Sequence, residues 1–204
     1  MVLDKSLYYY GGPYHVLIDT ITGEQRKQVL QFVPQGTSVL DAGCGTGELS
    51  LELKRKLNCQ VVGVDLSVQM ITFAQKRNPY SDVKFLHRDA SHIPDFEDNA
   101  FDLAVMCQVM HEVPLNVQIS ITKELLRLAN QVILSDYNSP MPKNSQSFVS
   151  RLIEATLGRD HHHNFHDYLN GGGLVAMIDM AGFSPRIQHR LEFNHACHQV
   201  IILG

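Results

Sequence analysis

Short apolar runs alternate with longer helical patterns along the first two thirds of the chain. The runs are rich in β-branched residues and each ends at a polar residue, whereas apolar residues recur at helical spacing in the segments between them. The runs predict strands over 37–41, 60–65, 83–87, 101–108 and 131–136, and the helical patterns predict helices over 48–57, 68–76 and 118–129. Because strands and helices alternate, we expect an α/β domain with a mostly parallel sheet.

The last third of the chain has a different pattern. We expect an amphipathic helix over 145–157, a short helix over 174–180 and an antiparallel hairpin formed by the alternating segments 186–193 and 196–203. Between the two helices lies segment 159–170, which is polar and rich in histidine. Its composition favours a loop on the surface.

The sharpest local signal is the segment VLDAGCGTGE, in which a predicted strand runs through Asp41, Gly43, Gly45 and Gly47 into a predicted helix. Glycines let backbone N–H groups approach a ligand closely, because no Cβ stands in the way. A dinucleotide-binding loop has the spacing G-x-G-x-x-G, whereas these glycines recur every second residue. Asp41 would repel a pyrophosphate and attract an ammonium group. The loop therefore favours a cationic or zwitterionic ligand.

A second carboxylate, Asp65, follows the glycine loop in the sequence. Asp65 lies 18 residues after Gly47 and ends the second predicted strand. In this place a carboxylate can accept two hydrogen bonds from a ribose diol. Loop and carboxylate together indicate a nucleoside that carries an amino-acid tail.

Three segments, in this order, resemble the class I S-adenosylmethionine-dependent methyltransferases: VLDAGCGTGELS, VVGVDLS and FLHRDASHIPDFEDNAFDLAVMCQVMHEV. The likeness runs from about Val39 to Asp136 and is strongest to the small-molecule branch related to the ubiquinone and menaquinone methyltransferases. It implies a Rossmann-like, doubly wound, seven-stranded α/β sheet that is mostly parallel, with an antiparallel C-terminal strand.

The resemblance also implies a role for each residue that matches a family motif. Taken singly, the aspartates among these residues have an alternative role as turn or helix-capping residues. The expected cofactor-binding residues are Tyr14 over the cofactor carboxylate, Asp41 and Gly43 at the methionine end, Gly45 and Gly47 in the same loop, Asp65 on the ribose, Leu66 and Met70 beside the adenine ring, Asp89 and Ala90 at its polar edge, and Cys107 or Gln108 at the ammonium group.

His111 is the predicted catalytic residue. A sulfonium methyl is already a good electrophile, so one base that removes a proton from an alcohol or amine would suffice. His111 follows the fourth predicted strand, whose end faces the cofactor crevice in such a sheet. Related proteins often have two adjacent histidines there, and this chain has Met110 in the first place. The alternative is a histidine that caps the next helix or contacts the cofactor without proton transfer.

The chain has 204 residues, the size of one domain. Within a single methyltransferase domain over 1–204 we expect an N-terminal lid or helices over 1–35, a cofactor-binding half over 37–136, an acceptor-site insertion over 139–173 and a C-terminal helix and hairpin over 174–204. The tyrosines of the N-terminal part, Tyr14 among them, are lid residues or plain packing residues.

The histidines of segment 159–170 raise the question of a metal. His162 and His166 would share a face only if the segment were helical. We favour a solvated loop, then a lid that contacts the substrate, and a metal site last. We therefore expect no metal.

Charge, apolar content and cysteine spacing limit the partners and the cellular location that we expect. Lys and Arg number 17 against 21 Asp and Glu, a net charge of −4, and the cations are scattered, which disfavours nucleic acid as a partner. No apolar stretch approaches the roughly 20 residues of a membrane span, and the N-terminus lacks a signal-peptide pattern. The four cysteines form no C-x-x-C pair, so we expect them to be reduced and structural.

We therefore expect a cytoplasmic monomer or homodimer that transfers a methyl group from S-adenosylmethionine to a small-molecule acceptor, leaving S-adenosylhomocysteine. The alternative is a non-catalytic module that binds either nucleoside and acts through a protein partner. An NAD-linked oxidoreductase is opposed by the glycine spacing.

Overall fold

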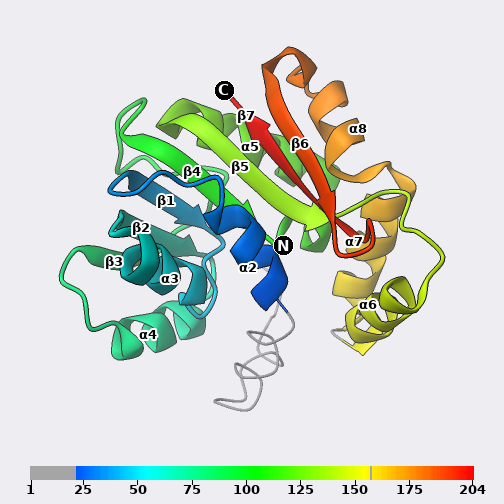
Figure 1. Cartoon of the computed structure of the whole chain (residues 1–204), viewed down its shortest axis with the longest axis horizontal. Coiled ribbons are helices and arrows are strands. Elements are labelled where there is room, and N and C mark those ends of the chain that lie inside the picture. The colour runs from blue at the N-terminus through cyan, green and yellow to red at the C-terminus, as the bar shows by residue number, and fades with distance from the viewer. Residues whose placement is uncertain (1–21, 157) are drawn as a thin grey trace.

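A computed structural model describes residues 22–156 and 158–204 of the chain. The predicted cofactor contact of Tyr14 lies outside the described residues, as does most of the predicted lid over 1–35. Figure 1 shows the described part as a central twisted sheet with helices on both faces.

The sheet has seven strands in the order β3-β2-β1-β4-β5-β7-β6 (Figure 1). β1 to β5 are parallel to one another, whereas β7 is antiparallel to both β5 and β6. The predicted seven-stranded, mostly parallel sheet with an antiparallel C-terminal strand is confirmed. The strands are β1 (Ser38–Ala42), β2 (Gln60–Asp65), β3 (Val83–His87), β4 (Phe101–Cys107), β5 (Ala129–Tyr137), β6 (Ile187–Phe193) and β7 (His198–Leu203).

The helices cover the two faces of this sheet. Successive residues of a strand point to opposite faces, so each inner strand feeds two cores. Leu103 and Val105 of β4 pack with one set of helices, and Ala104 and Met106 pack with the other. The first core includes α2 (Gly23–Leu30), α3 (Glu48–Leu57) and α4 (Val68–Arg77), and the second includes α5 (Leu115–Leu128), α7 (Arg159–Asn170) and α8 (Gly173–Met180).

Segment 159–170 is the helix α7, so the predicted surface loop is wrong. His161, Phe165, Tyr168 and Leu169 are buried, and their spacing places them on one face of the helix. The polar composition concealed this apolar stripe, which packs into the core and stabilises the helix. A further helix, α6 (Ser145–Thr156), lies between β5 and α7 and packs against α7.

Several boundaries also differ from the predictions, and two of them lie on either side of His111. α5 begins at Leu115, directly after Pro114, and not at residue 118. The fourth strand ends at Cys107, because Gln108 has a φ of 59° and cannot continue the strand. The chain then enters the 3-10 turn η2 (Met110–Glu112), which carries His111.

The four cysteines are free, and Cys44, Cys59 and Cys197 are buried. In the part of the chain that the structure describes, no helix has the length and apolar character needed to cross a membrane.

Candidate active site

The carboxyl ends of β1 to β4 meet at one edge of the sheet. The chain leaves β1 toward β2 and leaves β4 toward β5, on the opposite side, and ligands bind in the crevice at such a reversal. Asp65 is the last residue of β2 and Cys107 is the last residue of β4. Asp41 is the penultimate residue of β1, and Asp89 follows β3 by two residues. The sheet order thus brings these four residues to the same edge, which we call the carboxyl edge.

The three loop glycines are needed for different reasons. All have a positive φ, of 70° at Gly43, 52° at Gly45 and 80° at Gly47. A Cβ on Gly43 would lie 2.6 Å from a methyl group of Val109, and one on Gly47 would lie 2.6 Å from Cζ of Phe85. A Cβ on Gly45 would meet no atom within 4 Å. Gly43 and Gly47 therefore permit close packing, whereas Gly45 borders open space where a ligand can approach the backbone.

Asp65 ties the glycine loop to the next helix. Its Oδ2 accepts a hydrogen bond from the Gly45 N–H at 2.9 Å, and its Oδ1 accepts one from the Ser67 N–H at 2.8 Å. Each carboxylate oxygen can accept a second hydrogen bond, so the ribose role predicted for Asp65 fits this arrangement. Leu66 is 58% exposed, and Met70 is half-buried at the start of α4. Leu66 and Met70 thus come soon after Asp65, the carboxylate predicted to bind the ribose.

Asp41 is buried and accepts a hydrogen bond from the Ser50 hydroxyl at 2.6 Å. Burial raises the pKa of the Asp41 carboxyl to about 6, although the Ser50 hydrogen bond opposes the rise and nearby Asp65 adds to it. A cation placed near Asp41 would favour its ionised form. The site is therefore prepared for a positively charged group.

The remaining predicted cofactor residues occupy turns at the same edge. Asp89 is exposed, and its Oδ1 accepts hydrogen bonds from the N–H and the hydroxyl of Ser91, at 2.8 and 2.7 Å, which is a turn-stabilising arrangement. Ala90 is half-buried beside it. Gln108 donates its backbone N–H to the carbonyl of Ser135 at 2.8 Å, and its side-chain Nε2 is buried without a hydrogen-bond partner among the described residues. That amide needs an acceptor which a ligand can supply.

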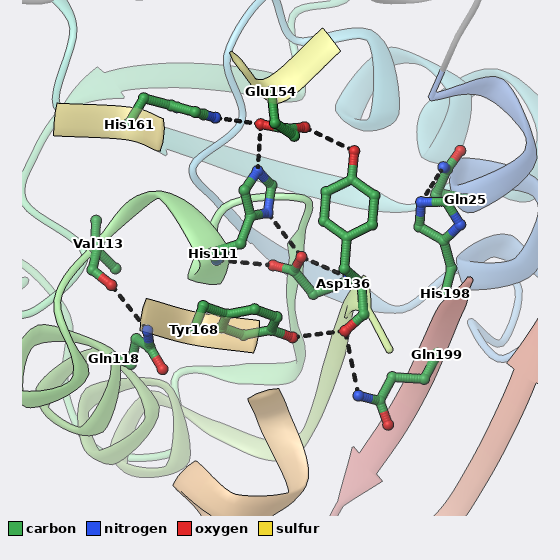
Figure 2. A network of polar contacts seen from close by, with 11 residues as sticks. Gln25, His111, Val113, Gln118, Asp136, Glu154, His161, Tyr168, His198 and Gln199 are labelled. Atoms are coloured by element: carbon green, nitrogen blue, oxygen red, sulfur yellow. Dashed lines mark hydrogen bonds and ion pairs between the residues drawn. The ribbon is translucent and has the colours of Figure 1, made fainter. Parts of the chain in front are cut away.

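A second group of polar side chains lies beyond the end of β4. Figure 2 shows His111 between Asp136 and Glu154, with His161 approaching Glu154 from another side. We call His111, Asp136, Glu154 and His161 the imidazole–carboxylate cluster, and all four are buried. They come from four elements, η2, β5, α6 and α7.

Both ring nitrogens of His111 face carboxylates. Nδ1 lies 2.7 Å from Oδ1 of Asp136, and Nε2 lies 3.6 Å from Oε2 of Glu154. The backbone N–H of His111 also donates to Asp136 Oδ2, at 3.2 Å. Glu154 accepts further hydrogen bonds from the Tyr137 hydroxyl, at 2.7 Å, and from Nε2 of His161.

These contacts set the charges of the cluster. Burial lowers the pKa of His111, but Asp136 and Glu154 outweigh burial and raise it well above its ordinary value. Burial raises the pKa of Glu154, but His111 and His161 outweigh that effect and lower it. The two carboxylates therefore favour the protonated form of His111 in the ligand-free protein, whereas a general base needs an unprotonated nitrogen. The catalytic role of His111 stays a prediction, and this geometry does not favour proton abstraction.

A cavity of about 230 Å³ adjoins the cluster. Its lining combines the carboxyl end of β4 with residues of α2, α6, α7 and β7. It includes Gln25, Gln108, His111, Tyr137, Glu154, His161 and His198. Gln108 belongs both to this lining and to the predicted cofactor site, so the cavity lies beside the carboxyl edge.

The sequence alone did not predict Glu154, Tyr137 or the pairing of His161 with Glu154. One signal was available for His161. Its spacing from Phe165, Tyr168 and Leu169 places all four on one helical face. No local pattern marks Glu154, because its partners are distant in the sequence and reach it only through the tertiary fold.

Residues 39–132 match a family described as a methyltransferase domain. The demethylmenaquinone methyltransferase of Bacillus licheniformis is 31% identical over 117 residues, which are 54% of this chain and 49% of that protein. An O-methyltransferase of Penicillium expansum is 28% identical over 125 residues, 59% of this chain and 45% of that protein. A SAM-dependent methyltransferase from Aquifex aeolicus shares the fold, with a TM-score of 0.66, 18% identity and 98% of each chain covered.

The chain spans between about a third and a half of the length of the curated relatives it matches. The resemblance drawn from the three ordered motifs is nevertheless confirmed, since the matched residues include the glycine loop, Asp65 and Asp89.

Proposed function

We propose that the protein binds S-adenosylmethionine at the carboxyl edge and methylates a small molecule held in the adjoining cavity, because residues 39–132 match a methyltransferase domain. The cofactor supplies an electrophilic methyl group, and S-adenosylhomocysteine remains. The protein's own residues bind the cofactor, orient the acceptor and exclude water.

The main support for the proposal is the open space at Gly45, which lies beside two aspartates suited to bind the cofactor. A Cβ at Gly45 would meet nothing within 4 Å, although its neighbours in the loop are closely packed. Asp65 borders this space through its hydrogen bond to Gly45, and Asp41 lies four residues before Gly45 in the chain. Ribose hydroxyls need acceptors and an ammonium group needs an anion, and these two aspartates provide both.

The cavity supports a small acceptor. Its volume of about 230 Å³ is below the roughly 300–1,000 Å³ of typical ligand pockets, and its lining is a mixture of apolar and polar side chains. A compact metabolite fits such a space better than a segment of a macromolecule. The net charge of −4 also gives no support for a nucleic-acid acceptor.

For His111 we propose a role in shaping this cavity, because both of its ring nitrogens already face carboxylates. Catalysis then depends mainly on aligning the acceptor with the methyl group. If His111 is instead the base, His111→Ala lowers the single-turnover rate by about 10²–10⁴ while cofactor affinity is preserved.

Two measurements test the proposal. Calorimetry with S-adenosylhomocysteine and, separately, with NAD tests the identity of the cofactor. We expect saturable binding of S-adenosylhomocysteine alone, and binding of NAD in its place would refute the assignment.

A methyl-labelled cofactor is then incubated with the protein and, separately, with each of three pools, namely low-molecular-weight metabolites, RNA and unfolded protein. Label only in the metabolite pool supports the proposal, and label in RNA or protein contradicts it. Cofactor binding without any transfer would favour the non-catalytic module.

A further inference from the structure

We propose that His111, Glu154 and His161 form a binding site for a divalent transition-metal ion. In the part of the chain that the structure describes, these three residues form a group whose ligand atoms all lie within 4.8 Å of one another. Their side chains are 3%, 5% and 7% exposed, respectively, so the group is buried and not a cluster of solvated surface charges.

The donor types suit a zinc-like ion. Two imidazole nitrogens and one carboxylate oxygen are the ligands of many catalytic zinc sites, and imidazole also suits iron, nickel and copper. Calcium and magnesium prefer a shell of oxygen ligands, which this group does not offer. The ligand set therefore points to a first-row transition metal, with zinc as the probe of choice.

The second shell has the arrangement that metal-binding histidines need. A ligating imidazole commonly donates its other N–H to a carboxylate, which fixes the ring and its tautomer. Nδ1 of His111 lies 2.7 Å from Asp136 Oδ1, which leaves Nε2 directed at Glu154. The Tyr137 hydroxyl likewise orients Glu154, through a 2.7 Å hydrogen bond to Oε1.

The charges of the cluster also match a divalent ion. Asp136 and Glu154 bring two carboxylates into the interior, and buried charges require compensation. One divalent ion compensates both carboxylates while the two imidazoles act as neutral ligands.

An ion at this place would have a coordination position that faces the cavity. His111, Glu154 and His161 all line that cavity, so water or another small ligand in it can reach the site. Three protein ligands with one open position are typical of catalytic, and not of structural, zinc sites. No metal was expected from the sequence, because segment 159–170 was predicted to be a solvated loop. The structure instead makes it a helix and joins its His161 to two residues of other elements.

The test is a calorimetric titration of zinc into full-length protein that has been treated with a chelator, in the absence of any cofactor. We expect one tight ion per chain for the wild type. Cobalt in place of zinc adds a visible absorption spectrum that reports nitrogen and oxygen ligands. No saturable binding by the wild type would overturn the site, whatever the outcome of methyl-transfer assays.

Variants locate the ion. His161→Gln removes a ligand, and Tyr137→Phe removes the orienting hydroxyl with little change of shape. We expect Tyr137→Phe to weaken zinc binding roughly 10–100-fold, and His161→Gln to weaken it at least as much. Since Tyr137→Phe keeps all three ligands and the aromatic packing, it provides the answer if His161→Gln fails to fold.

The chain offers two matched controls on the same helix. His163 is 74% exposed and faces Asp167. His162 and His166 have ring centroids 4.5 Å apart, and neither belongs to the group of three proposed ligands. His163→Ala and the double variant His162→Ala, His166→Ala should bind zinc as the wild type does. Loss of binding in the double variant, with retention in His161→Gln, would place the ion elsewhere and refute the proposal.

Discussion

The carboxyl edge and the imidazole–carboxylate cluster are neighbours at the end of β4, yet they are built in different ways. The carboxyl edge depends on backbone geometry, with three left-handed glycines and a carboxylate that accepts two backbone N–H groups. The cluster depends on side chains from four elements, and His111 and Asp136 are 25 residues apart. A site made of backbone is specified by a local motif, whereas a site made of side chains exists only once the domain has packed.

The first prediction concerns the cluster, where we expect the largest effect on stability. Glu154→Ala removes a buried carboxylate that faces His111, His161 and the Tyr137 hydroxyl. In metal-free protein it should lower the free energy of unfolding by about 3–5 kcal/mol, because buried partners lose their compensation. Urea denaturation measures the change. His163→Ala, on the exposed face of α7, should change stability by no more than about 0.5 kcal/mol, and a similar small change in Glu154→Ala would show that the cluster is not a stabilising unit.

The second prediction separates packing from binding within the glycine loop. Gly47→Ala places a Cβ 2.6 Å from Phe85 at a φ of 80°, so overpacking and backbone strain should together cost about 2–4 kcal/mol of stability. Gly45→Ala meets no atom and should cost only the strain, about 1–2 kcal/mol, while it weakens binding of S-adenosylhomocysteine. Thermal unfolding and calorimetry on both variants provide the comparison. Normal nucleoside binding by a folded Gly45→Ala protein would contradict the placement of the ligand.

The same contrast explains what the sequence could predict. The strands over 60–65 and 83–87 and the helix over 48–57 were placed to the residue, because their apolar spacing and the turns between them are local. The Asp65 position followed from its place at a strand end. These features depend on neighbouring residues, which a single sequence displays.

Features that depend on tertiary packing were missed. The helix α7 was predicted as a loop, because its histidines hide a face that becomes apolar only when His161 pairs with Glu154 in the interior. The isolated segment has few apolar residues, and contacts with η2 and α6 stabilise it in the fold. Nothing in the sequence distinguished Glu154 from any other glutamate of an amphipathic helix.

The third prediction concerns the ribose contact. Asp65→Ala removes the acceptor of two backbone N–H groups and, in our proposal, of the ribose hydroxyls. Affinity for S-adenosylhomocysteine should fall by about 1.5–3 kcal/mol, the range for hydrogen bonds to charged groups. Titration calorimetry measures the loss. Asp89→Ala is the matched variant at the next strand, because Asp89 is exposed and bonded mainly to Ser91, and we expect its effect to be smaller. Unchanged affinity in Asp65→Ala would mean that the ribose lies elsewhere.

The last prediction is the smallest effect and uses pH to test the ammonium partner. The pKa of Asp41 is raised from 3.8 to about 6, chiefly by burial, so in the free protein the carboxyl binds a proton as the pH falls through 6. An ammonium group attracts only the ionised form. Affinity for S-adenosylhomocysteine should therefore be constant above about pH 7 and fall below pH 6, by up to about tenfold, or 1.4 kcal/mol, per pH unit. Calorimetry from pH 5 to 8 measures the profile. Asp41→Asn cannot ionise, and its binding should be weaker at pH 7.5 and nearly independent of pH. A wild-type profile as flat as that of Asp41→Asn would separate Asp41 from the ligand and leave it a role in the fold alone.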